Sequence, residues 1–537
     1  MKKIIMAVLL LFLVNPSQAA EWQWSVPESN SRAYLWAPPD CQRIRAIVLA
    51  NHNMIEQGVL EHPTMRKALS DLGIAEVWVV PGLDIKFDPA GDAGKRFQDL
   101  MDRLADVSGY EELKLVPVVT FGHSANATWP WNFAAWNPGR TLAVLSIHGD
   151  APETNLPGFG GKNCGWGNRN IDGVPGLMVM GEYEWWEDRL TPMFAFKQKY
   201  PKAALALLAD AGHGHFDYSD ELVSFLAMFI RKAAQTRLPE LSPPGKPAEL
   251  KAVEPEKGWR IDRWRKDKSP VALAAPYAEY KGDTNTAFWC FDEEMAKATE
   301  EYYVVARGKK PQLLSVTNDR MDLEQGCGEP VAPRFIPIED GMSFKLKAAF
   351  VDVVPDRGNA ARWADMPVGS ALGHATGGGP IVLSRIVGPV EKVDENTFRL
   401  HFGRAEYTQD RRNNDMWLLA SHPGDRQYKS AVQQLMVRAV PNKDGKLQTI
   451  TFPELCDVKD GTKTVKLSAT SDAGLPVQYY ILEGPAEIDG DALKITDIPL
   501  RSKFPIKVTV VAWQWGFSGK DGVQTAVPVE RTFKIVK

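Results

Sequence analysis

The sequence has 537 residues, more than one hydrophobic core usually accommodates, so several domains are expected. Hydrophobic residues make up 44% and charged residues 24%, which is ordinary for a globular protein and excludes a disordered, collagen-like or multi-span membrane chain. The net charge of -4 gives no electrostatic reason to expect nucleic acid as a partner, because phosphate binding needs clustered lysine and arginine.

The first 20 residues have the order of a secretory signal peptide. Lys2 and Lys3 precede an apolar run from Ile4 to Val14, and small residues ending in Ala19-Ala20 follow it. The apolar run is shorter than the roughly 20 residues that span a bilayer. We therefore expect residues 1–20 to be removed, leaving a periplasmic or secreted protein with no membrane span.

Residues 21–237 alternate strand and helix signals and predict an α/β domain. Two short alternating segments come first, at 21–26 and 31–37, and indicate antiparallel edge strands. Almost continuous apolar runs follow, as a buried parallel sheet requires, at 45–50, 75–80, 115–121, 141–147, 176–180 and 203–208. Helical stretches lie between them, for example at 65–72, 95–107 and 221–232. The prediction is a mostly parallel sheet with helices on both faces.

A sharp turn with a serine follows the run at 115–121. The residues are Gly122-His123-Ser124-Ala125-Asn126-Ala127, small on either side of Ser124, and a helical stretch comes next. Strand, tight turn, nucleophile and helix in this order resemble the nucleophile elbow of the α/β-hydrolase superfamily, in particular serine esterases of the dienelactone hydrolase and acetyl esterase kind. The match covers the first part of the Gly-x-Ser-x-Gly motif, and Asn126 replaces its last glycine. The resemblance implies that Ser124 is the nucleophile.

The same resemblance implies an acid and then a histidine after the next strands. Glu184 follows the run at 176–180 in a Gly-x-x-acid turn, with Glu182 and Asp188 as alternatives. His213 follows the run at 203–208 in a Gly-His pair, with His215 as the second choice. In this scheme the histidine takes the serine proton during attack on an ester carbonyl, and the carboxylate orients the imidazole.

The oxyanion that forms in this reaction needs backbone N–H donors. Ala125 directly follows the nucleophile, and Asn53 or Met54 lies in the loop after the run at 45–50, so these are the expected donors. A glycine-rich loop at about 150–174, which includes Phe159, is expected to form a wall of the substrate cleft. The residues expected to contact substrate are His52, Trp129, Trp166, Trp185 and His215.

The remaining chain predicts a linker and two β-rich domains. Residues 238–274 begin with a proline-rich, charged stretch, which favours an extended linker. Residues 275–452 predict an all-β accessory domain with one helix between Asp292 and Tyr303. Residues 453–537 alternate at 464–468, 506–510 and 532–536 and predict a small sandwich that resembles bacterial Ig-like modules.

Five cysteines are too widely spaced for a zinc site or a dense disulfide framework, and their odd number cannot pair completely. A single bridge such as Cys290–Cys327 is compatible with the count.

The sequence thus predicts an exported serine esterase without metal or cofactor. The expected partner is a small-molecule or polysaccharide ester, with acetyl, feruloyl or methyl esters of plant polysaccharides as the class that export and the β-modules favour. The alternatives are a serine peptidase, a polyester hydrolase, or a non-catalytic cell-surface or carbohydrate-binding protein on a hydrolase scaffold.

Overall fold

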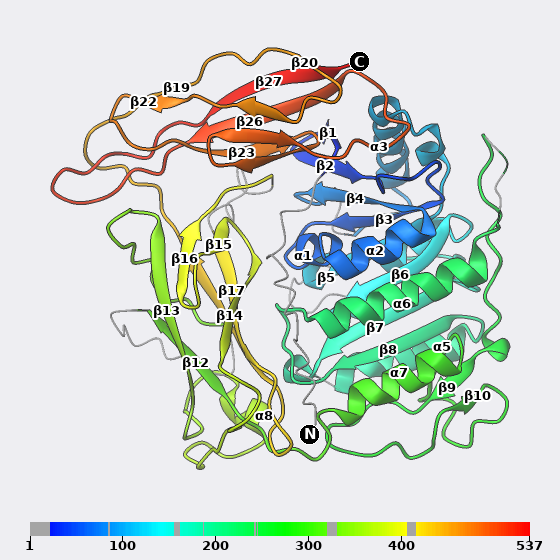
Figure 1. The fold of residues 1–537 in the computed structure, drawn as a ribbon. Helices are drawn as coiled ribbons and strands as arrows, with labels where there is room; N and C mark the ends of the chain where they lie inside the picture. Colours follow the sequence, from blue (N-terminus) through cyan, green and yellow to red (C-terminus); the bar gives the residue numbers. More distant parts are fainter. Residues whose placement is uncertain are drawn as a thin grey trace, which may run out of the picture.

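The computed structural model describes residues 22–83, 86–154, 162–185, 187–240, 243, 245–318, 330–404 and 415–537. The predicted signal peptide, Phe159 and Cys327 lie outside the described residues. Figure 1 shows three parts: an α/β domain (residues 22–306), a β-domain (residues 310–440) beside it, and a C-terminal sandwich (residues 446–537) across one end of both.

An eight-stranded sheet in the order β1-β2-β4-β3-β5-β6-β7-β8 forms the centre of the α/β domain. The β1–β2 and β2–β4 pairs are antiparallel, and all pairs from β4 to β8 are parallel. Its strands are β1 (Trp24–Glu28), β2 (Ser31–Trp36), β3 (Ala46–Asn51), β4 (Ile74–Val80), β5 (Val118–His123), β6 (Thr141–Ile147), β7 (Pro175–Gly181) and β8 (Ala204–Asp210). From β3 onward every strand residue is buried, as the continuous apolar runs predict.

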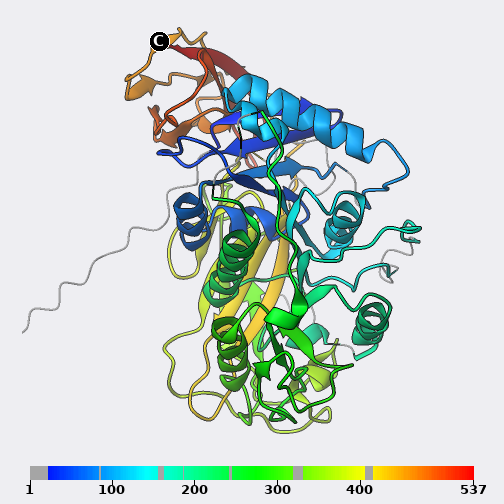
Figure 2. The ribbon, with the colours of Figure 1, turned by 90° about the vertical axis from the view of Figure 1, so that its right-hand side faces the viewer.

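Helices cover both faces of this sheet, which Figure 2 shows nearly edge-on. They are α1 (Glu56–Leu60), α2 (Pro63–Leu72), α3 (Ala93–Ser108), α4 (Trp129–Trp136), α5 (Leu190–Lys199) and α6 (Asp220–Arg237). Their ends follow local chemistry: Ser219 caps α6 by accepting a hydrogen bond from the Leu222 amide, and Gly73 ends α2 in the left-handed conformation. This is an α/β domain with a mostly parallel sheet and helices on both faces, as the sequence predicts.

The chain after residue 237 stays attached to the α/β domain. The Lys251 amide donates to the Arg237 carbonyl, and the Val253 amide donates to the Gly173 carbonyl. A three-stranded sheet in the order β10-β9-β11 follows, with β9 (Trp259–Ile261), β10 (Ala275–Pro276) and β11 (Phe288–Cys290). The predicted helix after Asp292 is α7 (Glu293–Val304), which Asp292 caps and which packs against β8 and α6. Cys290 is a buried free thiol.

The β-domain is built from two antiparallel sheets, in the orders β12-β13-β16-β15 and β14-β17-β18, with a short helix α8 (Ala360–Ala364). Its strands are β12 (Leu314–Asn318), β13 (Ser343–Phe350), β14 (Val382–Val387), β15 (Val390–Lys392), β16 (Thr397–Leu400), β17 (Asp415–His422) and β18 (Ala431–Arg438). Leu314, Phe398, Leu418 and Leu435 share its core.

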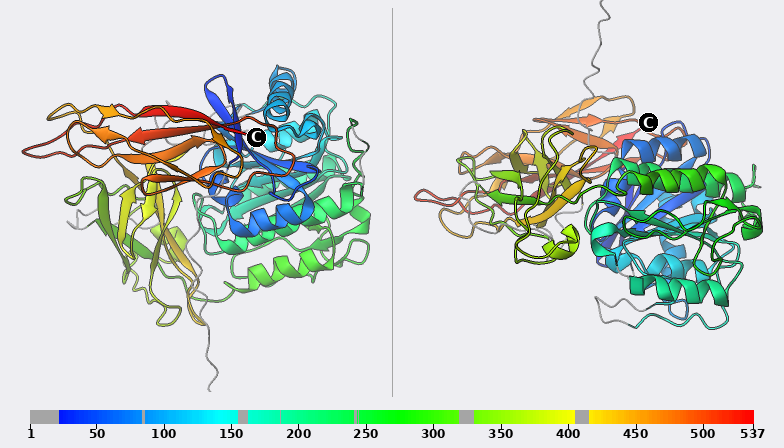
Figure 3. Two further views of the ribbon diagram at one scale, coloured as in Figure 1. Left: turned by 45° about the horizontal axis from the view of Figure 1, so that its top comes forward. Right: turned by 90° about the horizontal axis from the view of Figure 1, so that it is seen from below.

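The C-terminal sandwich has a four-stranded sheet, β20-β27-β26-β23, and a three-stranded sheet, β21-β25-β24, with the pair β19-β22 beside them. Its strands are β19 (Ile450–Thr451), β20 (Val458–Lys459), β21 (Thr464–Lys466), β22 (Thr470–Ser471), β23 (Gln478–Glu483), β24 (Ala486–Asp489), β25 (Ala492–Ile495), β26 (Ile506–Trp513) and β27 (Val529–Val536). Figure 3 shows it from two further sides, and the region is all-β as expected; its likeness to Ig modules stays a prediction. Among the described residues, no helix combines the length and apolarity needed to cross a membrane.

Candidate active site

A strained turn holds Ser124 at the end of β5. Ser124 has φ +53°, a left-handed conformation that is unusual for a residue with a side chain. Gly122 is needed beside it, because a Cβ there would collide with the carbonyl of Asn126. Asn126, which departs from the usual glycine, donates from Nδ2 to the Asn51 and His52 carbonyls at 3.2 and 2.9 Å. Its side chain thus ties the turn to the end of β3.

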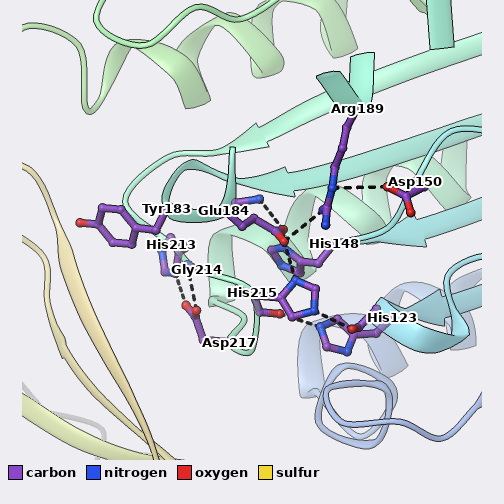
Figure 4. A network of polar contacts seen from close by, with 12 residues as sticks. His123, His148, Asp150, Tyr183, Glu184, Arg189, His213, Gly214, His215 and Asp217 are labelled. Atoms are coloured by element: carbon purple, nitrogen blue, oxygen red, sulfur yellow. Dashed lines mark hydrogen bonds and ion pairs between the residues drawn. The ribbon is translucent and has the colours of Figure 1, made fainter. Parts of the chain in front are cut away.

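Ser124, His215 and Glu184 form a continuous hydrogen-bonded chain. Ser124 Oγ lies 2.5 Å from His215 Nε2, and His215 Nδ1 lies 2.5 Å from Glu184 Oε2. Figure 4 shows His215 reaching from its loop toward Glu184, which follows β7. Burial alone would raise the pKa of the Glu184 carboxyl, but His215 and His148 hold that pKa well below its usual range. The acid therefore carries the negative charge that orients and stabilises a protonated imidazole.

His213, the first choice from the sequence, does not face Ser124, so that assignment is corrected to His215. His213 Nδ1 instead contacts Asp217 Oδ2 at 2.5 Å. Burial opposes protonation of His213, but Asp210 and Asp217 outweigh it and raise its pKa to about 10. An imidazole with this raised pKa is already protonated at neutral pH and cannot accept a further proton, so His213 is suited to holding its loop rather than to acting as a base.

The two alternative acids lie outside the chain of contacts. Glu182 is buried, but its oxygens accept hydrogen bonds from the Gly212 amide and Lys429 Nζ, both at 2.9 Å. Asp188 is exposed on the short turn before α5. Of the three carboxylates, Glu184 is the one that meets His215.

His148 is a second histidine on Glu184 that sequence reasoning did not assign to the site. Its Nδ1 lies 2.6 Å from Glu184 Oε1, which also accepts the Gly181 amide at 3.0 Å. Arg189 approaches Glu184 Oε2 and Asp150 Oδ1, each at 3.3 Å. His148 follows β6 with φ +49° and is fully buried. The sequence could have indicated His148 as a site residue, because it follows the carboxyl end of a parallel strand and such ends meet at one edge of the sheet.

His123 connects the nucleophile turn (residues 122–127) to the loop that carries His213 and His215, the histidine loop (residues 211–217). Its Nε2 lies 2.7 Å from the His215 carbonyl oxygen, which can only accept, so Nε2 carries the hydrogen. Burial and the neighbouring His215 and His148 hold the pKa of His123 well below its usual range. A neutral His123 therefore fixes the backbone of His215 relative to Ser124.

The predicted oxyanion donors Asn53 and Met54 are already engaged, so that expectation is corrected. Their amides donate to Oε2 of Glu56 at 2.9 and 2.7 Å, and the His123 amide donates to Oε1 at 3.0 Å. Glu56 is fully buried, and burial raises its pKa to about 7 despite these hydrogen bonds. Of the three predicted donors, Ala125, directly after Ser124, stays a candidate.

The predicted substrate-binding aromatics are largely core residues. Trp129 and Trp166 are each 1% exposed, so neither presents a ring face to a substrate, and both assignments are corrected. Trp185 is half-buried and packs edge-on against Trp264, with ring centroids 4.6 Å apart. His52 is half-buried, edge-on to Trp78. His215 was expected to bind substrate and instead joins the chain of contacts to Ser124.

Within the described part of the chain, His148, Glu184 and His215 are the group whose ligand atoms lie close enough to hold a metal ion. The Glu184 oxygens, however, already lie at hydrogen-bond distances of 2.5 and 2.6 Å from the two imidazoles. A metal would have to replace both hydrogen bonds, so the group is better suited to proton transfer. The expectation of no metal and no cofactor stays a prediction.

Comparisons with known proteins give structural likeness only. No family model matches the sequence, and no curated protein matches it. An S-formylglutathione hydrolase from Agrobacterium tumefaciens aligns with 40% of this chain and 93% of its own, at 16% identity and a TM-score of 0.31. A soluble variant of monoglyceride lipase from Saccharomyces cerevisiae aligns with 41% of this chain and 96% of its own (13% identity, TM-score 0.27). An alpha-beta serine hydrolase homologue from Coxiella burnetii aligns with 40% of this chain and 99% of its own (13% identity, TM-score 0.27).

Proposed function

We propose that this protein is a serine hydrolase that cleaves carboxylic esters through an acyl-enzyme. The observation that carries the proposal is the chain from Ser124 through His215 to Glu184, with 2.5 Å at each step. A hydroxyl on a strained turn, an imidazole and an ionised carboxylate in contact are the parts that nucleophilic acyl transfer requires.

Each step follows from these contacts. His215 Nε2 takes the proton of Ser124 Oγ as the oxygen attacks the ester carbonyl, and Glu184 stabilises the imidazolium that forms. The imidazolium then gives the proton to the leaving alcohol, which leaves the acyl group on Ser124. Water, deprotonated by His215, then attacks the acyl carbon, and His215 returns the proton to Ser124 Oγ as the carboxylic acid leaves. We assign the Ala125 amide as a donor to the oxyanion, since it directly follows the nucleophile.

We propose further that the protein is exported and acts on acetyl, feruloyl or methyl esters of polysaccharides. The support is the order of charged, apolar and small residues at 1–20 and the β-rich modules after the α/β domain. Peptide or polyester substrates, and binding without turnover, are the outcomes that a substrate screen would separate from this one.

The test compares the wild-type protein with Ser124→Ala on p-nitrophenyl acetate and with a fluorophosphonate probe. We expect kcat to fall by about 10⁴ to 10⁶ and labelling to vanish, because no other group replaces the nucleophile. Ser224→Ala is the matched control: its exposed hydroxyl donates to the Asp220 carbonyl on the surface of α6, so the substitution should change neither readout. Wild-type protein that neither turns over the ester nor takes the label would contradict the proposal.

A further inference from the structure

The two loops that carry Glu184 and His215 lie directly against the β-domain. A Cβ added at Gly212 would collide with Ser430, and one at Gly214 would lie 2.7 Å from Nε2 of Gln434. Phe216, next to His215, packs on Trp417 of β17 with ring centroids 4.9 Å apart. The histidine loop is therefore shaped by residues more than 200 positions further along the chain.

Gln434 of β18 makes the most direct link to the histidine loop. Its Nε2 donates to Oδ1 of Asp217, which also accepts the Gly214 amide at 3.0 Å, while Oδ2 contacts His213. Asp217 and Gln434 are 0% and 1% exposed. The Asp217 carboxylate thus binds His213 and the Gly214 amide, on the N-terminal side of His215. A β-domain amide, that of Gln434, holds this carboxylate in place. Figure 4 shows the β-domain strand passing beside Asp217 and Tyr183.

Lys429, just before β18, makes the corresponding link to the acid turn, the turn at residues 181–185 that carries Glu184. Its buried Nζ lies 2.9 Å from Glu182 Oε1 and 2.8 Å from Asp267 Oδ2. Glu182 Oε2 accepts the Gly212 amide, so a single carboxylate joins the acid turn, the start of the histidine loop and the β-domain.

Tyr183, between Glu182 and Glu184, is held from the same side. Its carbonyl accepts a hydrogen bond from Arg362 of α8 at 2.7 Å, and its ring stacks on Trp363 at 4.4 Å with an interplanar angle of 11°. The β-domain therefore holds Tyr183, the residue before Glu184, through both its carbonyl and its ring.

We propose that Gln434 and Lys429 are positioning residues for the reaction, so that the β-domain forms part of the catalytic apparatus rather than an appended binding module. The proposal rests on the proposed esterase function. Its physical basis is the short reach of the proton transfer: a displacement of about 1 Å in a catalytic group can cost a factor of 10² in rate. Both loops are oriented by contacts from outside the α/β domain, so their loss should misplace His215 and Glu184 before it unfolds the chain.

The test measures kcat and KM for p-nitrophenyl acetate, the fluorophosphonate labelling rate and Tm in the full chain. For Gln434→Leu we expect kcat and labelling to fall by about 10- to 100-fold while KM changes less than about threefold. Gln448→Leu is the matched control: Gln448 is a buried glutamine of the C-terminal sandwich whose side chain bonds Gln514, Gln524 and Ser471. It should lower Tm comparably without changing kcat.

Lys429 provides the second arm. Lys429→Arg keeps the charge and should retain most of kcat. The double variant Glu182→Gln/Lys429→Met removes both charges, so that no buried ion is left unpaired at position 182, and it should lower kcat about tenfold or more. If Gln434→Leu and the double variant keep wild-type kcat, or lose no more than Gln448→Leu does, the positioning role is overturned. Wild-type protein without turnover or labelling would overturn the esterase proposal itself, and this inference with it.

Discussion

His213 and His215, separated by Gly214, have different chemistry because their carboxylate partners differ in position. His213 meets Asp217 and has its pKa raised to about 10, while His215 bridges Glu184 and Ser124. His215 is the imidazole whose second nitrogen faces a hydroxyl, so it is the one that can pass a proton to and from the substrate. The neighbouring Gly212 and Gly214 let the loop lie close enough to its surroundings for both side chains to reach their partners.

The raised pKa of His213 predicts a pH-dependent contribution to stability. A histidine protonated more readily in the folded state stabilises that state fully below its ordinary pKa of about 6.5, and this contribution is lost as the pH rises through about 10. We expect His213→Gln to lower the free energy of unfolding by about 2 to 4 kcal/mol at pH 6 and by much less at pH 10. Urea unfolding at both pH values checks this. An equal loss at both would contradict it.

At the scale of elements, the nucleophile turn is joined to the end of β3 by Asn126. The amide of Asn126 satisfies two loop carbonyls, so the larger residue is accepted where glycine is usual. The close approach that the turn requires is provided by Gly122, whose missing side chain leaves room for the Asn126 backbone.

Asn126→Gly should therefore destabilise the protein although it restores the usual motif. We expect a loss of about 1 to 3 kcal/mol in the free energy of unfolding, from two hydrogen bonds and from the greater freedom of glycine. The fluorophosphonate labelling rate should fall less than about threefold, because Gly122 and the strain at Ser124 are unchanged. Thermal unfolding and labelling measured together check this; an unchanged or higher Tm would show that the Asn126 contacts contribute nothing.

The sequence predicted the elements of the α/β domain closely, because strands that are buried on both faces of a sheet appear in the sequence as continuous apolar runs. Continuous apolar runs gave β3 to β8, and the small residues around Ser124 marked the turn. The choice between His213 and His215 could not be made locally, since it depends on which side of the loop Asp217 and Gln434 occupy. The oxyanion assignment failed for a similar reason: Glu56, three residues beyond Asn53, binds the amides that the loop position suggested.

At the scale of the whole molecule, the three parts share hydrophobic cores. Trp363, Leu419 and Val432 of the β-domain pack in the same core as β5 to β8, and Val508 and Ile535 of the C-terminal sandwich pack in the core that contains α3. Polar contacts reinforce these interfaces. Glu483 of β23, for example, accepts hydrogen bonds from Ser25 and Arg32 of the first hairpin at 2.7 and 3.0 Å.

Shared cores predict that the three parts unfold together. If no core extended across the boundaries between the parts, scanning calorimetry would resolve separate transitions. Here, unfolding one part would expose apolar surface of its neighbour and remove the support of the histidine loop. We therefore expect one calorimetric peak, with calorimetric and van't Hoff enthalpies in close agreement, and loss of fluorophosphonate labelling over the same temperatures. Two resolved peaks, with labelling retained after the first, would show instead that the α/β domain keeps its site without the β-domain.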